Sequence, residues 1–244
     1  MMVTQGNRSG GEPSVVRRGA CPARASGNLL HLTPEGVVWG AASCYRGGSM
    51  ARTRSIESLL EGLRSPSADV KYGCAKSLRL LSEQTPERLY PHFDLFFSLF
   101  EGQNTILRLG ATRILGNLAA ADREDKLEAA FDRFFAPVAG HEMIGAANVI
   151  QAAAQIAMAK PRLADRIAGE ILQVEGASYR TPECRNVAIG HAIQAFDRFL
   201  PQVTLRGPVM EFVQRQLENP RPATRHKAER FLKRWAAGNH SLLP

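Results

Sequence analysis

The segment Phe93-Asp94-Leu95-Phe96-Phe97 is repeated 38 residues later as Phe131-Asp132-Arg133-Phe134-Phe135. Each copy is followed by an Ala-rich stretch that has the periodicity of a helix. A sequence pattern that recurs every roughly 20 to 50 residues is typical of repeat proteins, in which each unit is one supersecondary motif. The repeat therefore predicts an array of similar helical units.

A second pattern recurs after these segments. A basic residue is followed three positions later by a small residue and seven positions later by an aliphatic residue, so the last two share one helix face. The five copies are Lys71/Cys74/Leu78, Arg108/Ala111/Leu115, Met143/Ala146/Ile150, where the first position is not basic, Arg185/Ala188/Ala192 and Arg225/Ala228/Leu232. Three positions further on, the core-facing stripe is completed by Leu81, Leu118, Ala153, Ala195 and Trp235.

A partner helix is predicted ahead of each of these helices. Its apolar residues recur at i, i+4 and i+8 in the sets Leu89/Phe93/Phe97, Leu127/Phe131/Phe135, Leu163/Ile167/Ile171 and Leu205/Val209/Val213, with a less regular first set of Ile56, Leu59, Leu60 and Leu63. Turn-forming residues separate the paired helices at Ser65-Pro66-Ser67, Gly102-Gln103-Asn104 and Asn219-Pro220-Arg221-Pro222. The sequence thus predicts an all-α fold of about five helical hairpins.

These helices resemble the HEAT/armadillo-like superfamily, above all in Val70-Lys71 with Cys74 and Leu78. The resemblance covers residues 54–236 and implies a right-handed α-solenoid whose second helices line the inner curve. The superfamily includes adaptors, transport receptors, assembly chaperones, DNA glycosylases and bilin lyases, so the fold alone does not select a function. Two departures from the family pattern matter. The third copy has Met143 where the other copies have a basic residue, and the Asp that often precedes the basic residue is present only as Asp69. A continuous Asp–Arg ladder between repeats is therefore not expected.

Residues 1–49 differ from the rest of the chain. They contain five arginines and two acidic residues, are rich in Gly, Ser and Pro, and show no regular periodicity. Such a composition predicts a disordered N-terminal segment. Met50 leads directly into the first periodic helix and is our preferred biological start, and an organelle transit peptide is the alternative. The predicted domains are residues 1–49, disordered, and residues 50–244, a HEAT-like repeat domain.

The formal net charge of +8 is local. Residues 50–220 hold 20 basic and 20 acidic residues, whereas residues 221–234 hold six basic residues and one acidic residue. No apolar run approaches the roughly 20 residues of a membrane span, so no membrane association is expected. The four cysteines form no close pair, which favours a reducing cytoplasm over a zinc or redox site, and Cys74 is predicted to be a buried hydrophobe.

The sequence predicts no catalytic, metal or cofactor site, and we expect that the protein is not an enzyme. The six histidines show no ligand spacing, and no nucleophile, phosphate-loop or dinucleotide motif occurs. His141-Glu142 is interpreted as a surface turn. The glycines Gly110, Gly116 and Gly145 fall in predicted helices, where they suit close helix packing.

Three further features have structural interpretations. The four phenylalanines between Phe93 and Phe100 are predicted to form the densest part of the core, with an excess that leaves a small groove for a peptide. Asp94 and Asp132 are equivalent positions, interpreted as helix caps, ion pairs between repeats or a solvated edge. His191 is expected to be a hydrogen-bonded core histidine.

The candidate partner-binding residues come from the predicted inner surface and the last helix. Five positions after the basic residue lie Lys76, Arg113, Asn148, Gly190 and Arg230, and nine positions after it lie Leu80, Asn117, Ala152, Gln194 and Arg234. On the last helix, Lys227, Arg230 and Arg234 are predicted to share the side opposite Ala228, Phe231, Leu232 and Trp235. This basic side is either a solubilising cap for the terminal repeat or a docking site.

The function predicted from these features is a non-enzymatic scaffold or adaptor that binds a protein or peptide. The alternative is nucleic-acid binding of the DNA glycosylase branch through the basic C-terminal helix. A duplex requires basic residues in nearly every repeat, which favours the protein ligand. A bilin-lyase-like role is a more distant third possibility.

Overall fold

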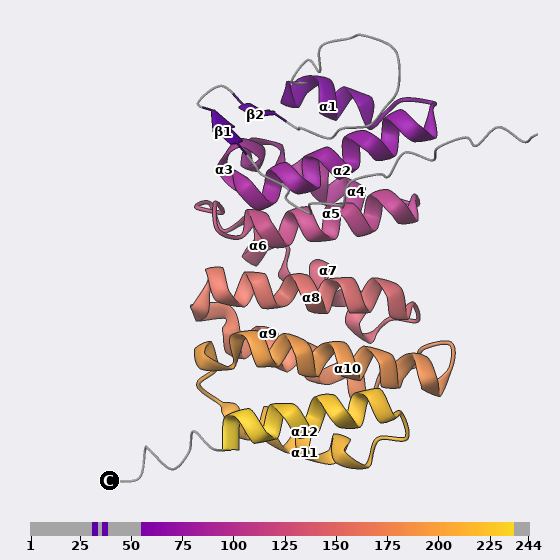
Figure 1. The fold of residues 1–244 in the computed structure, drawn as a ribbon, viewed down its shortest axis with the longest axis vertical. Coiled ribbons are helices and arrows are strands. Elements are labelled where there is room, and N and C mark those ends of the chain that lie inside the picture. The colour runs from indigo at the N-terminus through magenta and orange to yellow at the C-terminus, as the bar shows by residue number, and fades with distance from the viewer. Residues whose placement is uncertain (1–30, 34–35, 39–54, 237–244) are drawn as a thin grey trace, which may run out of the picture. The chain divides into compact units, whose positions relative to one another are not determined.

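The computed structural model describes residues 31–33, 36–38 and 55–236 (Figure 1). The chain divides into two units, Met1–Thr53 and Arg54–Pro244. In the first unit, β1 (His31–Thr33) pairs antiparallel with β2 (Gly36–Val38), a hairpin that the sequence analysis did not anticipate. The disorder predicted for the rest of residues 1–49 and the start proposed at Met50 lie outside the described residues.

Every described element of the second unit is a helix, which confirms the all-α prediction. Five helices lie side by side in chain order (Figure 1), and each packs on the next. We call them the long helices: α2 (Ala68–Gln84), α5 (Thr105–Leu118), α8 (Met143–Ala159), α10 (Pro182–Phe199) and α12 (Pro222–Ala236).

A shorter helical segment precedes each long helix and packs against it. The first is α1 (Ile56–Gly62). The others combine α-helices with 3-10 helices, labelled η: α3 (Pro86–Leu89), η1 (Tyr90–His92) and α4 (Phe93–Phe100); α6 (Lys126–Ala129), α7 (Phe131–Phe135) and η2 (Ala136–Ala139); η3 (Pro161–Leu163), α9 (Ala164–Leu172) and η4 (Gln173–Glu175); η5 (Leu200–Gln202), α11 (Arg206–Arg215) and η6 (Gln216–Glu218).

Local sequence signals explain several helix starts. Side-chain oxygens of Ser55, Asn104 and Thr181 accept hydrogen bonds from main-chain N–H groups in the first turns of α1, α5 and α10. Such N-caps satisfy donors that have no partner within the helix. The three predicted turn segments, beginning at Ser65, Gly102 and Asn219, all lie between helices.

The predicted apolar stripes form the core. Members of both sets, such as Leu78, Leu115, Ile167 and Val213, are essentially inaccessible to solvent. Cys74 is buried, as predicted. Leu205 is a correction: it is 70% exposed, because α11 begins only at Arg206 and the preceding residue remains outside the helix.

The end of the last stripe is also less buried than predicted. Leu232 and Trp235 are half-buried rather than part of a closed core. The indole Nε1 of Trp235 donates a hydrogen bond to Asp197 Oδ1 of α10 at 2.9 Å. A residue with one polar atom keeps its ring partly accessible when that atom is held at the surface, so Trp235 anchors the edge of α12.

The phenylalanine cluster confirms the dense core and corrects the predicted groove. Phe93, Phe96, Phe97 and Phe100 are all buried, so none remains to line a peptide groove. Phe100 packs on Phe134 with ring centroids 5.2 Å apart and thereby joins α4 to α7. Aromatic pairs at this separation add to the stability gained by burial.

Ion pairs connect several of the short segments to the next one. Asp94 pairs with Lys126 at 3.5 Å and Asp132 pairs with Arg166 at 2.8 Å, which confirms the interpretation of these aspartates as partners in ion pairs between repeats. These side chains are largely exposed, and exposed pairs contribute little individually. Packing between the helices therefore dominates the stability of the row.

Candidate interaction surface

The exposed side of the long helices carries most of the residues that the sequence analysis selected. Two of the ten positions predicted to lie on the inner surface were predicted wrongly, because Gly190 and Ala152 are buried. A Cβ added to Gly190 would stand 3.1 Å from Lys227 Nζ, and Ala152 lies against Gly116 of α5. Contacts between neighbouring long helices cover both positions. Equivalent positions of the repeated sequence pattern are therefore not equally exposed on this surface.

Three candidate residues lie on the first three long helices. Arg113 Nε of α5 donates to Asn148 Oδ1 of α8 at 3.3 Å, so the structure brings these two together. Lys76 of α2 is exposed and has no ion-pair or hydrogen-bond partner among the described residues. Among these three candidates, Lys76 is thus a cation without a partner in the described part of the chain, and Arg113 and Asn148 form an amide–guanidinium pair.

The other three candidates lie on α12 and do not share one solvated side. Lys227 Nζ reaches to α10 and donates to Gln194 Oε1 at 3.0 Å. Arg234 pairs with Asp197 Oδ2 of α10 at 3.0 Å, and its guanidinium lies 5.4 Å from the Trp235 ring centroid. Arg230 is exposed and pairs with no described residue. The three residues were predicted to share the side of α12 opposite its buried residues; the side chains of two of them extend from there to α10.

The positive charge of α12 is partly neutralised by α10. Arg221 pairs with Glu183, and Arg234 pairs with Asp197. Arg225 instead donates to the main-chain carbonyl of Asn219 at 2.7 Å and fixes the turn before α12. The described carboxylates leave Lys227, Arg230 and Lys233 of α12 and Arg198 of α10 without an ion-pair partner.

The environment of His191 is electropositive. Burial, followed by the charges of Lys227 and Arg221, lowers the pKa of His191 below its usual value. Burial, followed by the charges of Arg221 and Arg230, likewise lowers the pKa of Lys227. Burial disfavours a charge of either sign, whereas the contribution of the neighbouring cations shows that the local charge is positive and favours an anionic group. We call His191, Lys227 and Arg230 the basic patch.

Amide side chains border the basic patch. Gln194 accepts from Lys227, and Gln151 Nε2 of α8 lies 3.3 Å from His191 Nδ1. His191 is half-buried at the surface and not a core residue, so its predicted burial is corrected while its hydrogen bonding is as expected. The patch therefore combines cations with groups that can both donate and accept hydrogen bonds.

The glycines of the long helices fall into two kinds. Gly116 is buried, and a Cβ there would stand 2.9 Å from Ala152 Cβ, which confirms close packing of α5 on α8. Gly110 has no atom within 4 Å of such a Cβ, and Gly145 has only Pro137 Cβ, at 3.9 Å. Helix packing therefore does not require glycine at these two positions, contrary to prediction.

The sequence analysis missed a buried polar cluster between the loops after α5 and α8. Lys160, which is 9% exposed, donates to the main-chain oxygen of Asp122 at 2.6 Å and to Asp125 Oδ1 at 2.6 Å. Asp122 also accepts from Tyr90 Oη at 2.8 Å. Burial and the hydrogen bond to Asp122 raise the pKa of Tyr90 to about 12. The bonds tie the loop after α5 to the segment before α5 and to the end of α8, which indicates a structural role.

Three other features of the described residues bear on function. His141 and Glu142 are both exposed just before α8, where Glu142 pairs with Arg108, so the surface-turn interpretation is confirmed. Among the residues that the structure describes, no three His, Cys, Asp or Glu side chains lie close enough together to hold a metal ion. None of the described helices has the length and apolar character needed to cross a bilayer.

No protein-family model matches the chain, and no curated protein matches it. The charges and hydrogen bonds of the surface described above therefore carry the functional inference.

Proposed function

We propose that this protein is a non-enzymatic interaction scaffold, built as a right-handed solenoid of about five HEAT-like hairpins, that binds an acidic segment of a partner protein at the basic patch. The order in which the long helices pack, α2 on α5, α5 on α8, α8 on α10 and α10 on α12, supports the solenoid. In such arrays each unit contacts only its neighbours and presents extended surfaces to ligands.

The observation that carries the proposal is the uncompensated charge of Lys227 and Arg230 beside the amides of Gln194 and Gln151. Lysine and arginine bind carboxylates through charge-assisted hydrogen bonds. Amide side chains can hydrogen-bond to the main chain of an extended peptide. A short run of Asp or Glu residues in a partner would thus satisfy both kinds of group at once.

Nucleic-acid binding of the DNA glycosylase branch is the second candidate, because α12 carries the densest basic sequence. That branch would place an aromatic ring beside a carboxylate, and Trp235 does lie beside Asp197. However, the Asp197 carboxylate is held by hydrogen bonds from both Trp235 and Arg234. The basic patch itself is confined to α10 and α12, which is a small footprint for a duplex.

The two candidates are separated by one titration of the full chain. We expect a fluorescent 12-residue Glu-rich peptide to bind, and the double substitution Lys227→Gln/Arg230→Gln to weaken binding roughly tenfold. The matched control is Arg64→Gln/Arg88→Gln, which removes two exposed cations away from the long helices and should leave binding unchanged. A labelled DNA duplex of equal charge should bind more weakly than the peptide. Tighter binding of the duplex, or equal losses in both variants, would contradict the proposal.

A further inference from the structure

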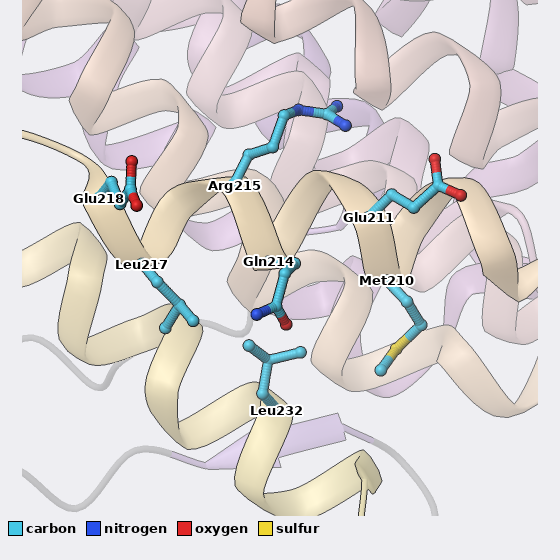
Figure 2. Close-up of a pocket in the computed structure, with 7 residues that line it drawn as sticks. All are labelled: Met210, Glu211, Gln214, Arg215, Leu217, Glu218 and Leu232. Atoms are coloured by element: carbon cyan, nitrogen blue, oxygen red, sulfur yellow. The ribbon is translucent and has the colours of Figure 1, made fainter.

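A groove runs between α11 and α12 at the far end of the row of helices (Figure 2). Met210 and Leu217 from the α11–η6 segment and Leu232 from α12 line it, with Gln214 between them. Its volume is about 860 Å³. The three apolar side chains are each half-buried, so the groove presents an apolar floor.

This groove occupies the side of the last helical pair on which a further pair would pack. Each earlier pair is covered there by its successor, as α9 is by α11. The sequence analysis expected the basic residues of α12 to cap this end. Lys227 and Arg234 instead contact α10, and Leu232 lines a groove that none of the described residues fills. An uncapped terminal unit retains an apolar surface that another element can cover.

The rim of the groove is acidic. Glu211 and Glu218 are exposed, and neither forms an ion pair with a described residue. Arg215 lies between them, but Glu175 accepts from its Nε at 3.1 Å and from its terminal nitrogen at 2.7 Å. Glu175 thereby compensates the charge of Arg215, and the carboxylates of Glu211 and Glu218 make the rim negatively charged.

We infer that an amphipathic helix with basic residues, supplied by a partner protein, docks lengthwise in this groove. Its apolar stripe would cover Met210, Leu217 and Leu232, as an amphipathic helix does in a groove between helices. Glu211 and Glu218 are seven residues apart, about two helical turns or roughly 10 Å. Lysine or arginine residues seven positions apart on the partner would therefore meet both carboxylates.

The full chain can be tested with a designed 18-residue helical peptide that has leucines at i, i+3, i+4 and i+7 and lysines seven positions apart. A matched peptide replaces the lysines with glutamates. The double substitution Glu211→Lys/Glu218→Lys should weaken binding of the lysine peptide roughly tenfold and improve binding of the glutamate peptide. Glu57→Lys/Glu61→Lys on the exposed side of α1 is the matched control and should have no effect.

Leu232→Asn tests the apolar floor separately. It should also weaken binding of the lysine peptide, but the protein should still bind the lysine peptide more tightly than the glutamate peptide. Absence of binding by the lysine peptide, or equal affinity for the two peptides, would overturn the inference. A dimer seen by sedimentation that Leu232→Asn dissociates would also overturn it, because a second copy would then fill the groove. None of these changes touches the basic patch, so the outcome is independent of the acidic-peptide titration.

Discussion

The ammonium group of Lys227 lies over Gly190, where a Cβ would stand 3.1 Å from Nζ. The missing side chain on α10 lets Lys227 cross from α12 and donate to Gln194. Lys227 is therefore held at the surface between two long helices, in a field made positive by Arg221 and Arg230.

Lys227→Met separates binding from stability. Burial, followed by the charges of Arg221 and Arg230, lowers the folded-state pKa of Lys227, so its charge is less favourable in the folded state than in the unfolded state. This cost is fully present below the folded-state pKa and is gone above the unfolded-state pKa. Removing the charge at pH 7 should leave the melting temperature unchanged or raise it, while binding of the acidic peptide weakens several-fold. A lower melting temperature with unchanged binding would mean that Lys227 serves the fold alone.

Two glycines of α5 should respond in opposite ways to alanine. Gly110→Ala should stabilise the protein by about 0.5–1 kcal/mol, because alanine favours helix and the added methyl meets open space. Gly116→Ala should destabilise it by about 1–3 kcal/mol, because the methyl would collide with Ala152 of α8. Urea unfolding of the two variants measures both changes. The same sign for both would contradict the packing of α5 on α8.

These glycines also show what sequence patterns can and cannot predict. The burial of Ala111 and Leu115 was predicted correctly. A small residue and an aliphatic residue at helical spacing usually pack against another element. Gly110 and Gly116 look alike in sequence. Only the register of α5 against α8 distinguishes a glycine that is covered from one that is open.

Long polar side chains were the other source of error. Lys227 and Arg234 lie on the predicted side of α12, but both extend far enough to reach α10. Lys160 and Asp122 lie in or beside loops, with no periodicity to mark them, and meet only through the stacking of neighbouring helical pairs. The candidate residues were thus identified in part, whereas their partners required the structure.

The buried Lys160 is expected to be important for stability. Lys160→Met should cost about 3–5 kcal/mol, because it leaves the buried Asp122 carboxylate without its cation. Adding Asp122→Asn should recover part of the loss by removing the unpaired charge. Chemical denaturation of the single and double variants measures the coupling free energy between Lys160 and Asp122. Strictly additive losses would show that the two side chains do not act as a pair.

His191 should make acidic-peptide binding pH dependent. Burial, followed by the charges of Lys227 on α12 and of Arg221 just before α12, lowers the pKa of His191 in the free protein, and Gln151 of α8 lies beside the ring. Protonation costs more in the folded than in the unfolded state, so stability without ligand should fall as the pH drops below about 6.5. A bound carboxylate should raise the pKa, so affinity should increase several-fold as the pH falls. His191→Gln should abolish this pH dependence, and an undiminished dependence would assign it to another group.

The central claim is that a partner's acidic segment binds across α10 and α12. Hydrogen–deuterium exchange of the full chain, with and without saturating Glu-rich peptide, tests its location directly. The account predicts slower exchange in α10 and α12, and in the neighbouring part of α8 around Gln151. Protection confined to the short segments before the long helices, or no protection under saturating conditions, would contradict it.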